Sequence, residues 1–177
     1  MGFAAVGFES SEAFLAHYED QPGCLITDYR MAGMNGLELQ ETLLKRGCDL
    51  PLIMVTAYAR TPLTIQAIKS GAVTLLDKPY DEDSLWQAIR KALTQDDQQR
   101  QTKRHLADVR RRLESLSEKE RAVLDLLVAG KANKAMASQL EVSLRTIENR
   151  RRSIFSKLGV ETVAELVALV FKSDTTP

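Results

Sequence analysis

Three residues that could handle a phosphoryl group each stand at the end of a short apolar run. Asp28 ends the run within residues 24–29, Thr56 ends PLIMVT, and Lys78 follows AVTLL. A carboxylate can attack a phosphoryl group to form an acyl phosphate, whose added oxygens are stabilised by a cation and a hydroxyl donor. Lys78 and Thr56 can supply both. An Asp in such a place more commonly caps the turn that follows, so the functional interpretation depends on whether the three residues meet.

A second candidate site is the basic stretch SLRTIENRRRSIFSKLG, residues 143–159. Its apolar residues Ile147, Ile154 and Leu158 recur at spacings of seven and four, which predicts a helix that buries one edge and turns its arginines outward. In the major groove of DNA, Arg pairs with guanine and Asn with adenine, while other basic groups neutralise phosphates. A basic run alone is more often a solvated face. Here a predicted helix at 133–140 and a three-residue turn precede it, which is the plan of a helix-turn-helix.

The elements that would position the first three residues alternate between strands and helices. The predicted strands are residues 3–8, 24–29, 51–58 and 72–76, and the predicted helices are about 11–19, 35–46, 62–70 and 82–94. Short unbroken apolar runs are typical of strands buried on both faces, and the alternation predicts βαβ units around a parallel sheet. The carboxyl ends of such strands line one crevice, where Asp28, Thr56 and Lys78 are expected to meet.

Beyond the alternating region every segment has a helical pattern. The polar stretch from Thr94 to Arg112 leads into a thin apolar stripe, which is either a short coiled-coil-like seam or a solvated helix packed on its neighbour. The stripe consists of Leu106, Val109, Leu113 and Leu116. Four short helices follow: one opened by a capping box of Ser117 and Glu120, one at 133–140, one from Ser143 to Gly159, and a last one with an apolar face. They predict a small all-α domain.

Composition sets the broad class. The chain has 177 residues, 44% hydrophobic and 27% charged, as in ordinary globular proteins. Residues 1–94 hold 12 Asp and Glu against 8 Lys and Arg, whereas residues 95–177 hold 12 against 16, so an acidic half is joined to a basic half. No apolar run would span a bilayer, which predicts a cytoplasmic protein. Cys24 and Cys48 are expected to be reduced core thiols, and the two histidines offer little to a metal.

The C-terminal half resembles the LuxR-type DNA-binding domain of transcriptional regulators. That family's pattern is L-(S/T)-x-(R/K)-E, a helix ending at Gly, N-K-x-x-A-x-x-L, S-x-x-T-(V/I) and K-L. The matching residues are Leu116, Glu120, Gly130, Asn133, Lys134, Ala137, Leu140, Ser143, Thr146, Ile147, Lys157 and Leu158.

This resemblance implies roles for the basic helix. Base reading falls to Glu148, Asn149 and Arg152, and phosphate contacts to Thr146 and Lys157. The predicted DNA-binding set is Arg145, Thr146, Glu148, Asn149, Arg150, Arg152 and Lys157. Arg150 departs from the family, which often has His there, and adds a positive charge. Family members usually pair through the last helix, so Leu166, Val170 and Phe171 form either a dimer seam or simply core.

The N-terminal half resembles the receiver domain of bacterial response regulators. The motif D-x-R-M-x-G-x-x-G begins at Asp28, T-A at Thr56 and K-P-Y at Lys78. The resemblance implies that Asp28 is the phosphoacceptor and a Mg²⁺ ligand, that Thr56 and Lys78 bind the phosphoryl group, and that the Lys78–Pro79 peptide is cis. One departure is Leu75, which stands where receivers usually carry an aromatic switch residue; Tyr80 keeps the other usual aromatic.

A larger departure concerns the metal. A receiver's first strand ends in two acids that bind Mg²⁺ together with the phosphoacceptor. Here residues 3–8 take the place of the second strand, and only Met1 and Gly2 precede them. The first strand normally lies between the second and third in a 2-1-3-4-5 order. We therefore expect either a fragment, or a degenerate receiver that re-pairs its strands within the chain or with another chain.

Together the two resemblances predict a response regulator of the FixJ and NarL class. The expected fold is an α/β receiver, a flavodoxin-like parallel sheet without its first strand, followed by a four-helix helix-turn-helix domain. The predicted domains are an incomplete receiver at 1–94, a helical linker at 95–115 and the DNA-binding domain at 116–174.

The predicted function is transcriptional regulation switched by phosphorylation of Asp28, with promoter DNA, a histidine kinase and a second copy as partners. The alternative is a phosphorylation-independent DNA-binding or dimerisation protein. An Asp-nucleophile phosphohydrolase would need a second Asp where Arg30 stands, so we expect a regulator and not an enzyme.

Overall fold

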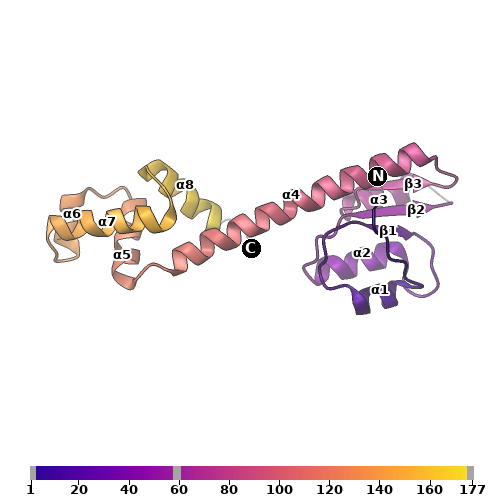
Figure 1. Ribbon diagram of the computed structural model, residues 1–177, viewed down its shortest axis with the longest axis horizontal. Coiled ribbons are helices and arrows are strands. Elements are labelled where there is room, and N and C mark those ends of the chain that lie inside the picture. The colour runs from indigo at the N-terminus through magenta and orange to yellow at the C-terminus, as the bar shows by residue number, and fades with distance from the viewer. Residues whose placement is uncertain (1–2, 58–60, 175–177) are drawn as a thin grey trace. The chain divides into compact units, whose positions relative to one another are not determined.

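The computed structural model describes residues 3–57 and 61–174. It divides into two compact units, an α/β unit of residues 1–101 and a helical unit of residues 102–177. Helix α4, Glu82–Glu114, begins in the first unit and ends in the second (Figure 1). No helix within the described ranges is both long enough and apolar enough to cross a bilayer.

The α/β unit is built on a parallel sheet in the order β1-β2-β3. Its elements in chain order are α1 (Ser11–His17), β1 (Leu25–Asp28), α2 (Gly36–Lys45), β2 (Leu52–Thr56), α3 (Thr61–Lys69), β3 (Thr74–Asp77) and the first part of α4. Asp28 lies opposite Val55 in the β1–β2 ladder, and Thr56 lies opposite Asp77 in the β2–β3 ladder. The strands therefore end at one edge of the sheet, as the alternating pattern predicted.

The central strand β2 separates two apolar layers. Leu52 and Met54 pack with α1, α2 and α3 on one face, while Ile53 packs with Ala88 and Ala92 of α4 on the other. All five β2 residues are buried, which explains why this strand is an unbroken apolar run and not an alternating one. Figure 1 shows α2 and α4 on opposite sides of the sheet.

The predicted strand at residues 3–8 is not formed. These residues are exposed and have no regular secondary structure. A strand requires a ladder partner for its main-chain groups, and within the described residues the sheet ends at β1. The apolar composition of FAAVGF was thus a poor guide to its conformation.

The helical unit is formed by the end of α4 and four short helices (Figure 1). These are α5 (Glu118–Val128), α6 (Asn133–Gln139), α7 (Leu144–Leu158) and α8 (Val163–Asp174). Their core includes Val123, Met136, Ile147, Ile154 and Leu166, each without exposed surface.

Local signals placed these helices well. Ser117 and Glu120 form the predicted capping box of α5, and the Ser143 side chain caps α7 by accepting a hydrogen bond from the Thr146 main-chain N–H. Gly159 ends α7 in the left-handed conformation at φ 68°.

The apolar stripe near the end of α4 packs inward. Leu116 belongs to the core of the helical unit and Leu113 packs against it. The stripe thus serves mainly to attach α4 to this unit, which favours packing on a neighbouring helix over a coiled-coil seam. Leu166 is likewise core, whereas the side chain of Phe171 is 59% exposed.

Candidate functional site

Asp28 and Lys78 form an ion pair at the carboxyl edge of the sheet. The Lys78 ammonium lies 2.6 Å from Asp28 Oδ2, although the residues are 50 positions apart. Asp28 ends β1, and Lys78 follows β3, held there by a 2.7 Å hydrogen bond from its main-chain N–H to the Thr56 carbonyl. The Lys78–Pro79 peptide is cis, as expected. Topology therefore brings together a carboxylate and a cation that the sequence keeps far apart.

Thr56 occupies the strand end between them. It is the last residue of β2, the strand paired with both β1 and β3, and it is 1% exposed. In the ladder it lies one position beyond Val55, the partner of Asp28. The three residues singled out from the sequence thus come from three adjacent strand ends. The side chains of Asp28 and Lys78 are in direct contact, and the main chain of Lys78 is bonded to the Thr56 carbonyl.

The ion pair controls the charge of Asp28. Partial burial acts to raise the pKa of this carboxyl, but hydrogen bonds from the Lys78 ammonium and the Arg30 main-chain N–H outweigh it, so the pKa is lowered. The same hydrogen bond raises the pKa of Lys78. Both groups are charged at neutral pH, and the carboxylate is in its nucleophilic form.

The loop after Asp28 needs glycine at the point where it leads into α2. A Cβ on Gly36 would lie 2.8 Å from the Asp28 carbonyl oxygen, so α2 can start this close to β1 only without a side chain there. Gly36 N–H donates to the Tyr29 carbonyl at 3.0 Å. This contact fixes the main chain directly behind the carboxylate.

Two residues of α1 also hold this loop, and sequence reasoning missed them. Glu12 Oε1 accepts a hydrogen bond from Met34 N at 3.0 Å, and the Ser11 hydroxyl donates to the Met34 carbonyl at 3.0 Å. Nothing in the sequence signals these contacts, since they join residues 22 and 23 positions apart. They attach α1 to the segment that carries Asp28.

The described residues do not fit a Mg²⁺ site around Asp28. Among them, no three His, Cys, Asp or Glu side chains gather closely enough to hold a metal ion. One oxygen of Asp28 is engaged by Lys78 and the other by Arg30 N. A divalent cation prefers several carboxylate or carbonyl oxygens, and Asp28 by itself is a single ligand.

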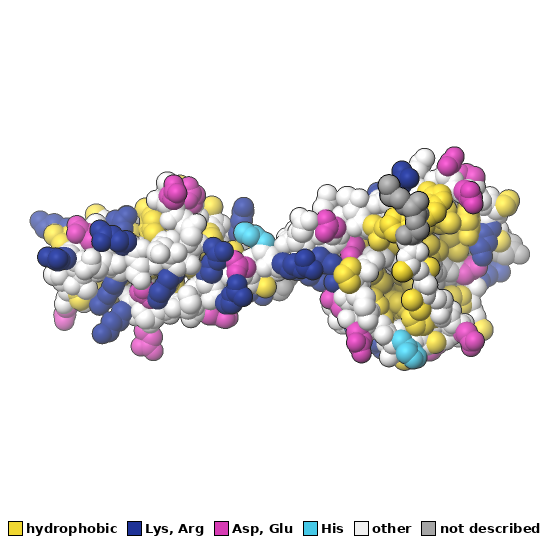
Figure 2. Space-filling model, in the orientation of Figure 1, with side chains coloured by type: hydrophobic (Ala, Val, Ile, Leu, Met, Phe, Trp, Pro, Cys, Tyr) yellow, Lys and Arg dark blue, Asp and Glu magenta, His cyan; other side chains and the backbone are white. Residues whose placement is uncertain are grey.

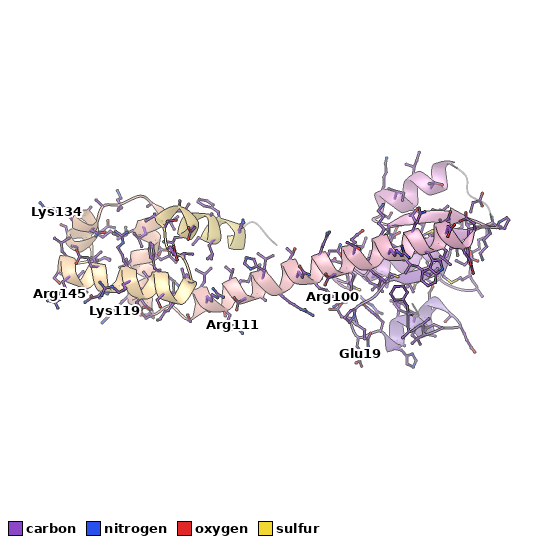
Figure 3. The ribbon with its side chains drawn as sticks, turned by 45° about the horizontal axis from the view of Figure 1, so that its top comes forward. Glu19, Arg100, Arg111, Lys119, Lys134 and Arg145 are labelled. Atoms are coloured by element: carbon purple, nitrogen blue, oxygen red, sulfur yellow. The ribbon has the colours of Figure 1, made fainter. Side chains whose placement is uncertain are left out.

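The second candidate site is the outward face of α7. Arg145, Glu148, Asn149 and Arg152 are exposed. Arg145 lies three or four positions before the adjacent pair Glu148 and Asn149, and Arg152 lies three or four positions after that pair, while Ile147, Ile154 and Leu158 are buried behind them. Figure 3 labels Arg145 on α7 and Lys134 on α6 at the same end of the helical unit. The predicted base-reading residues therefore share one accessible face.

The turn between α6 and α7 is tight. Val142 N–H donates to the Ala137 carbonyl at 3.0 Å, and Glu141 adopts a positive φ of 53°. Thr146 closes the start of α7, since its hydroxyl lies 2.8 Å from that of Ser143. These contacts set a helix-turn-helix with its second helix exposed.

Lys157, expected at a phosphate, has partners inside the protein. Its ammonium donates to Glu120 Oε2 at 2.7 Å and to the Ser115 carbonyl at 3.3 Å. Glu120 is 7% exposed and also accepts hydrogen bonds from the hydroxyls of Ser153 and Ser117. The Lys157 hydrogen bond and these further donors lower the pKa of Glu120 to about 2.

Arg151 braces α6 against α7 and was not singled out from the sequence. Its guanidinium donates to Asn133 Oδ1 and lies over the ring of Phe155, with Cζ 5.8 Å from the ring centroid. Within the run Arg150 to Arg152, the three arginines thus differ in surroundings. Arg151 is partly buried and bonded to Asn133, whereas Arg152 is exposed, and the sequence does not distinguish the two roles.

Comparison with protein families matches both halves of the chain. Residues 1–90 match the response regulator receiver domain, and residues 114–170 match the bacterial regulatory proteins of the luxR family.

Individual relatives cover nearly the whole chain. It is 36% identical to the transcriptional regulatory protein FixJ of Azorhizobium caulinodans over 99% of its length and 84% of that protein. It is 37% identical to the transcriptional regulatory protein TdiR of Thauera aromatica, over 95% of this chain and 74% of that protein. Among solved structures, the response regulator StyR is similar at a TM-score of 0.82 and 37% identity, covering 93% of this chain and 84% of StyR.

Proposed function

This chain belongs to the FixJ and NarL class of DNA-binding two-component response regulators, and on that premise we propose that Asp28 receives the phosphoryl group that switches it. The observation that carries the proposal is the 2.6 Å ion pair between Asp28 and Lys78 at adjoining strand ends. Response regulators are phosphorylated by histidine kinases, so the donor here is a kinase phosphohistidine.

The proposed transfer uses groups already in place. One carboxylate oxygen of Asp28 attacks the phosphorus, the P–N bond breaks with its electron pair left on the imidazole, and an acyl phosphate forms. Lys78 then pairs with a phosphoryl oxygen, and the Thr56 hydroxyl donates to another. Because the Lys78 ammonium already touches Oδ2, it has only a short distance to move.

The helical unit supplies the output. Response regulators of this class bind promoter DNA, and we assign the contact to the α7 face of Arg145, Glu148, Asn149 and Arg152. Figure 2 shows Lys and Arg side chains spread over this unit, as a phosphate-binding surface requires. The proposed active form is a homodimer whose two α7 helices reach two half-sites.

Lys157 has a changed role in this proposal. Its contacts with Glu120 and Ser115 leave the side chain 38% exposed, so it can approach a phosphate without leaving the ion pair. We therefore propose that the main role of Lys157 is to hold α7, the recognition helix, in position, and that its contribution to DNA affinity is secondary. Its hydrogen bonds to Glu120 and to the Ser115 carbonyl are the support for this order.

A second function is favoured by one specific observation, the poor fit of the described residues to a Mg²⁺ site. Receiver domains typically bind Mg²⁺, and the metal, where bound, neutralises charge on the phosphoryl oxygens. With one carboxylate ligand this chain would act as a DNA-binding protein whose α/β unit mediates interactions and is not phosphorylated. Both proposals share the same α7 face.

The experiment that separates the two is acetyl phosphate treatment of the full chain, with and without Mg²⁺. Intact mass should rise by one phosphoryl group and promoter affinity should increase if Asp28 is the acceptor. Asp28→Asn should show neither change, whereas Asp49→Asn, at the opposite end of the sheet, should behave like the unmodified chain. An unchanged mass in every condition would eliminate the phosphorylation switch and leave the second function.

A further inference from the structure

The last turn of α4 lies against the C-terminal end of α7. Arg112 Nη1 donates to the Leu158 carbonyl at 3.2 Å. The Lys157 ammonium donates at 3.3 Å to the carbonyl of Ser115, the residue directly after α4. Leu116 is 6% exposed and belongs to the same core cluster as Leu158. The end of α4 is therefore a fixed neighbour of the recognition helix within the helical unit.

The recognition helix α7 is longer than the major groove of DNA is wide. The proposed base-reading face, from Arg145 to Arg152, spans about 10 Å at about 1.5 Å per residue, and the groove is about 12 Å wide. Residues 153–158 of α7 add about 9 Å. Recognition helices place their N-terminal residues at the base edges. We therefore expect the C-terminal end of α7 to reach one of the two sugar-phosphate strands that border the groove.

Cations cover this end of α7. A helix C-terminus carries a negative partial charge of roughly half an elementary charge, which repels phosphate. Arg112 and Lys157 offset that charge, and Arg112 does so by donating to the carbonyl of Leu158, the last residue of α7. Their side chains are 43% and 38% exposed, so both remain partly open to solvent. The end of α7 can therefore face a phosphate strand without repulsion.

Arg111 is an exposed cation on the same turn of α4. Its side chain is 80% exposed, and its guanidinium forms an ion pair with Asp108. The other oxygen of Asp108 pairs with Arg112. One carboxylate between two guanidinium groups leaves a net charge of +1. An exposed ion pair of this kind adds little to stability, so folding gives no strong reason for an arginine at this position.

The surroundings of Arg111 hold more positive than negative side chains. Residues 108–121 together with Lys157 contain six Lys and Arg against four Asp and Glu. One of these acids, Glu120, is nearly buried and bonded to Lys157, so it adds little negative charge to the surface. Figure 3 labels Arg145, Lys119 and Arg111 along one side of the helical unit. Basic side chains thus continue from the α7 face toward the end of α4.

We propose that Arg111 binds a phosphate of the DNA backbone beside the groove that α7 occupies, so that α4 is itself part of the DNA interface. The inference rests on the proposed contact of α7 with DNA and adds a contact outside the helix-turn-helix. A guanidinium can give a phosphate two parallel hydrogen bonds. Leu113, packed against the core, anchors the turn that carries Arg111. A phosphate contact carries no sequence information, so Arg111 contributes equally on any duplex.

The test is the salt dependence of DNA binding by the full chain. Fluorescence anisotropy measures its affinity for a labelled duplex of mixed sequence between about 50 and 200 mM salt. Each neutralised phosphate contributes roughly 0.9 to the slope of log affinity against log salt. Arg111→Gln should lower the slope by this amount, so its loss of affinity should shrink about three- to fourfold from the lowest to the highest salt. Arg111→Lys keeps the charge and should retain most of the slope.

A matched control separates a local contact from the total charge of the unit. Lys172→Gln removes one exposed charge from α8 and should leave the slope unchanged. Circular dichroism checks that each variant is folded. An Arg111→Gln slope equal to that of the unmodified chain, or an equal reduction in Lys172→Gln, would overturn the proposal.

Asp108→Asn tests the proposal in the opposite direction. Removal of this carboxylate leaves the Arg111 guanidinium available to a phosphate, so affinity for the duplex should rise, which unfolding cannot produce. Asp125→Asn removes an exposed carboxylate of α5 and should raise the affinity less. Equal gains in the two variants would contradict a local role for Arg111.

The outcomes for α4 and for α7 can be told apart with Arg152→Ala on promoter DNA. A preference for promoter DNA that falls with Arg152→Ala, together with a salt slope unchanged by Arg111→Gln, would refute only the α4 contact. An unchanged preference with Arg152→Ala would refute base reading by this α7 face, and the inference drawn from it would fail as well.

Discussion

Replacement of Glu120 by glutamine removes one nearly buried charge from the helical unit with little change in volume. The pKa of Glu120 is lowered from 4.5 to about 2 by Lys157, Ser153 and Ser117. That difference corresponds to about 3 kcal/mol of stability at neutral pH. Glu120→Gln should lower the free energy of unfolding of the helical unit by roughly this amount, reduced by whatever hydrogen bonds the amide retains.

The pH dependence is the diagnostic part of this prediction. A carboxyl whose folded pKa is depressed contributes its full stabilisation above its unfolded pKa and loses it as the pH falls through the folded pKa. The difference between the native chain and Glu120→Gln should therefore be constant above about pH 5, and should shrink between 4.5 and about 2. Other acids titrate in this range, but they do so in both proteins and cancel in the difference.

Urea unfolding at several pH values measures this difference. Far-UV circular dichroism follows all helices, and the fluorescence of Trp86, the single tryptophan, follows the α/β unit. Glu118→Gln makes the same chemical change at an exposed position of the same helical turn and should cost little. A Glu120→Gln effect that is equal at pH 7 and pH 3 would refute the ion-pair explanation and point to packing instead.

Two further predictions concern the recognition helix. Gly159→Ala should lower the free energy of unfolding by the ~1–2 kcal/mol typical of a left-handed residue, because the one close contact of its Cβ, 2.8 Å from Arg112 Nη1, is with the end of a flexible side chain that can shift. Gly130→Ala, at φ 71° with open space around it, should show a similar loss, and a much larger loss for Gly159→Ala in urea unfolding would contradict the expectation that Arg112 can move aside. Arg152→Ala should weaken specific promoter binding by ~1–3 kcal/mol if Arg152 reads a base. Fluorescence anisotropy measures the binding, and Lys172→Ala is the control, which should have little effect. Similar losses for both variants would indicate a general effect of charge.

The sequence by itself determined the local elements and the two domain types. The capping box at Ser117, the cap at Ser143 and the left-handed Gly159 were readable because each depends on residues within a few positions along the chain. The strand ends at Asp28 and Thr56 were also predictable, since a parallel sheet aligns its carboxyl ends at one edge.

The same reasoning failed for residues 3–8. Their composition suits a buried strand, but a strand exists only when another main chain accepts its hydrogen bonds. Within the described residues β1 remains an edge, and the segment stays outside the sheet. An apolar segment becomes a strand only if another strand pairs with it, and the composition of the segment does not tell whether such a partner is present.

Tertiary structure alone decided which charges are free and which are engaged. Lys157 belongs to Glu120, 37 positions away, and Arg151 to Asn133, 18 positions away, while Arg152 beside it is exposed. Adjacent arginines on a helix point in directions about 100° apart, so one faces a neighbouring helix and the next faces solvent. A basic run therefore predicts a DNA-binding helix, but only its packing separates the residues that hold the helix from those that can reach DNA.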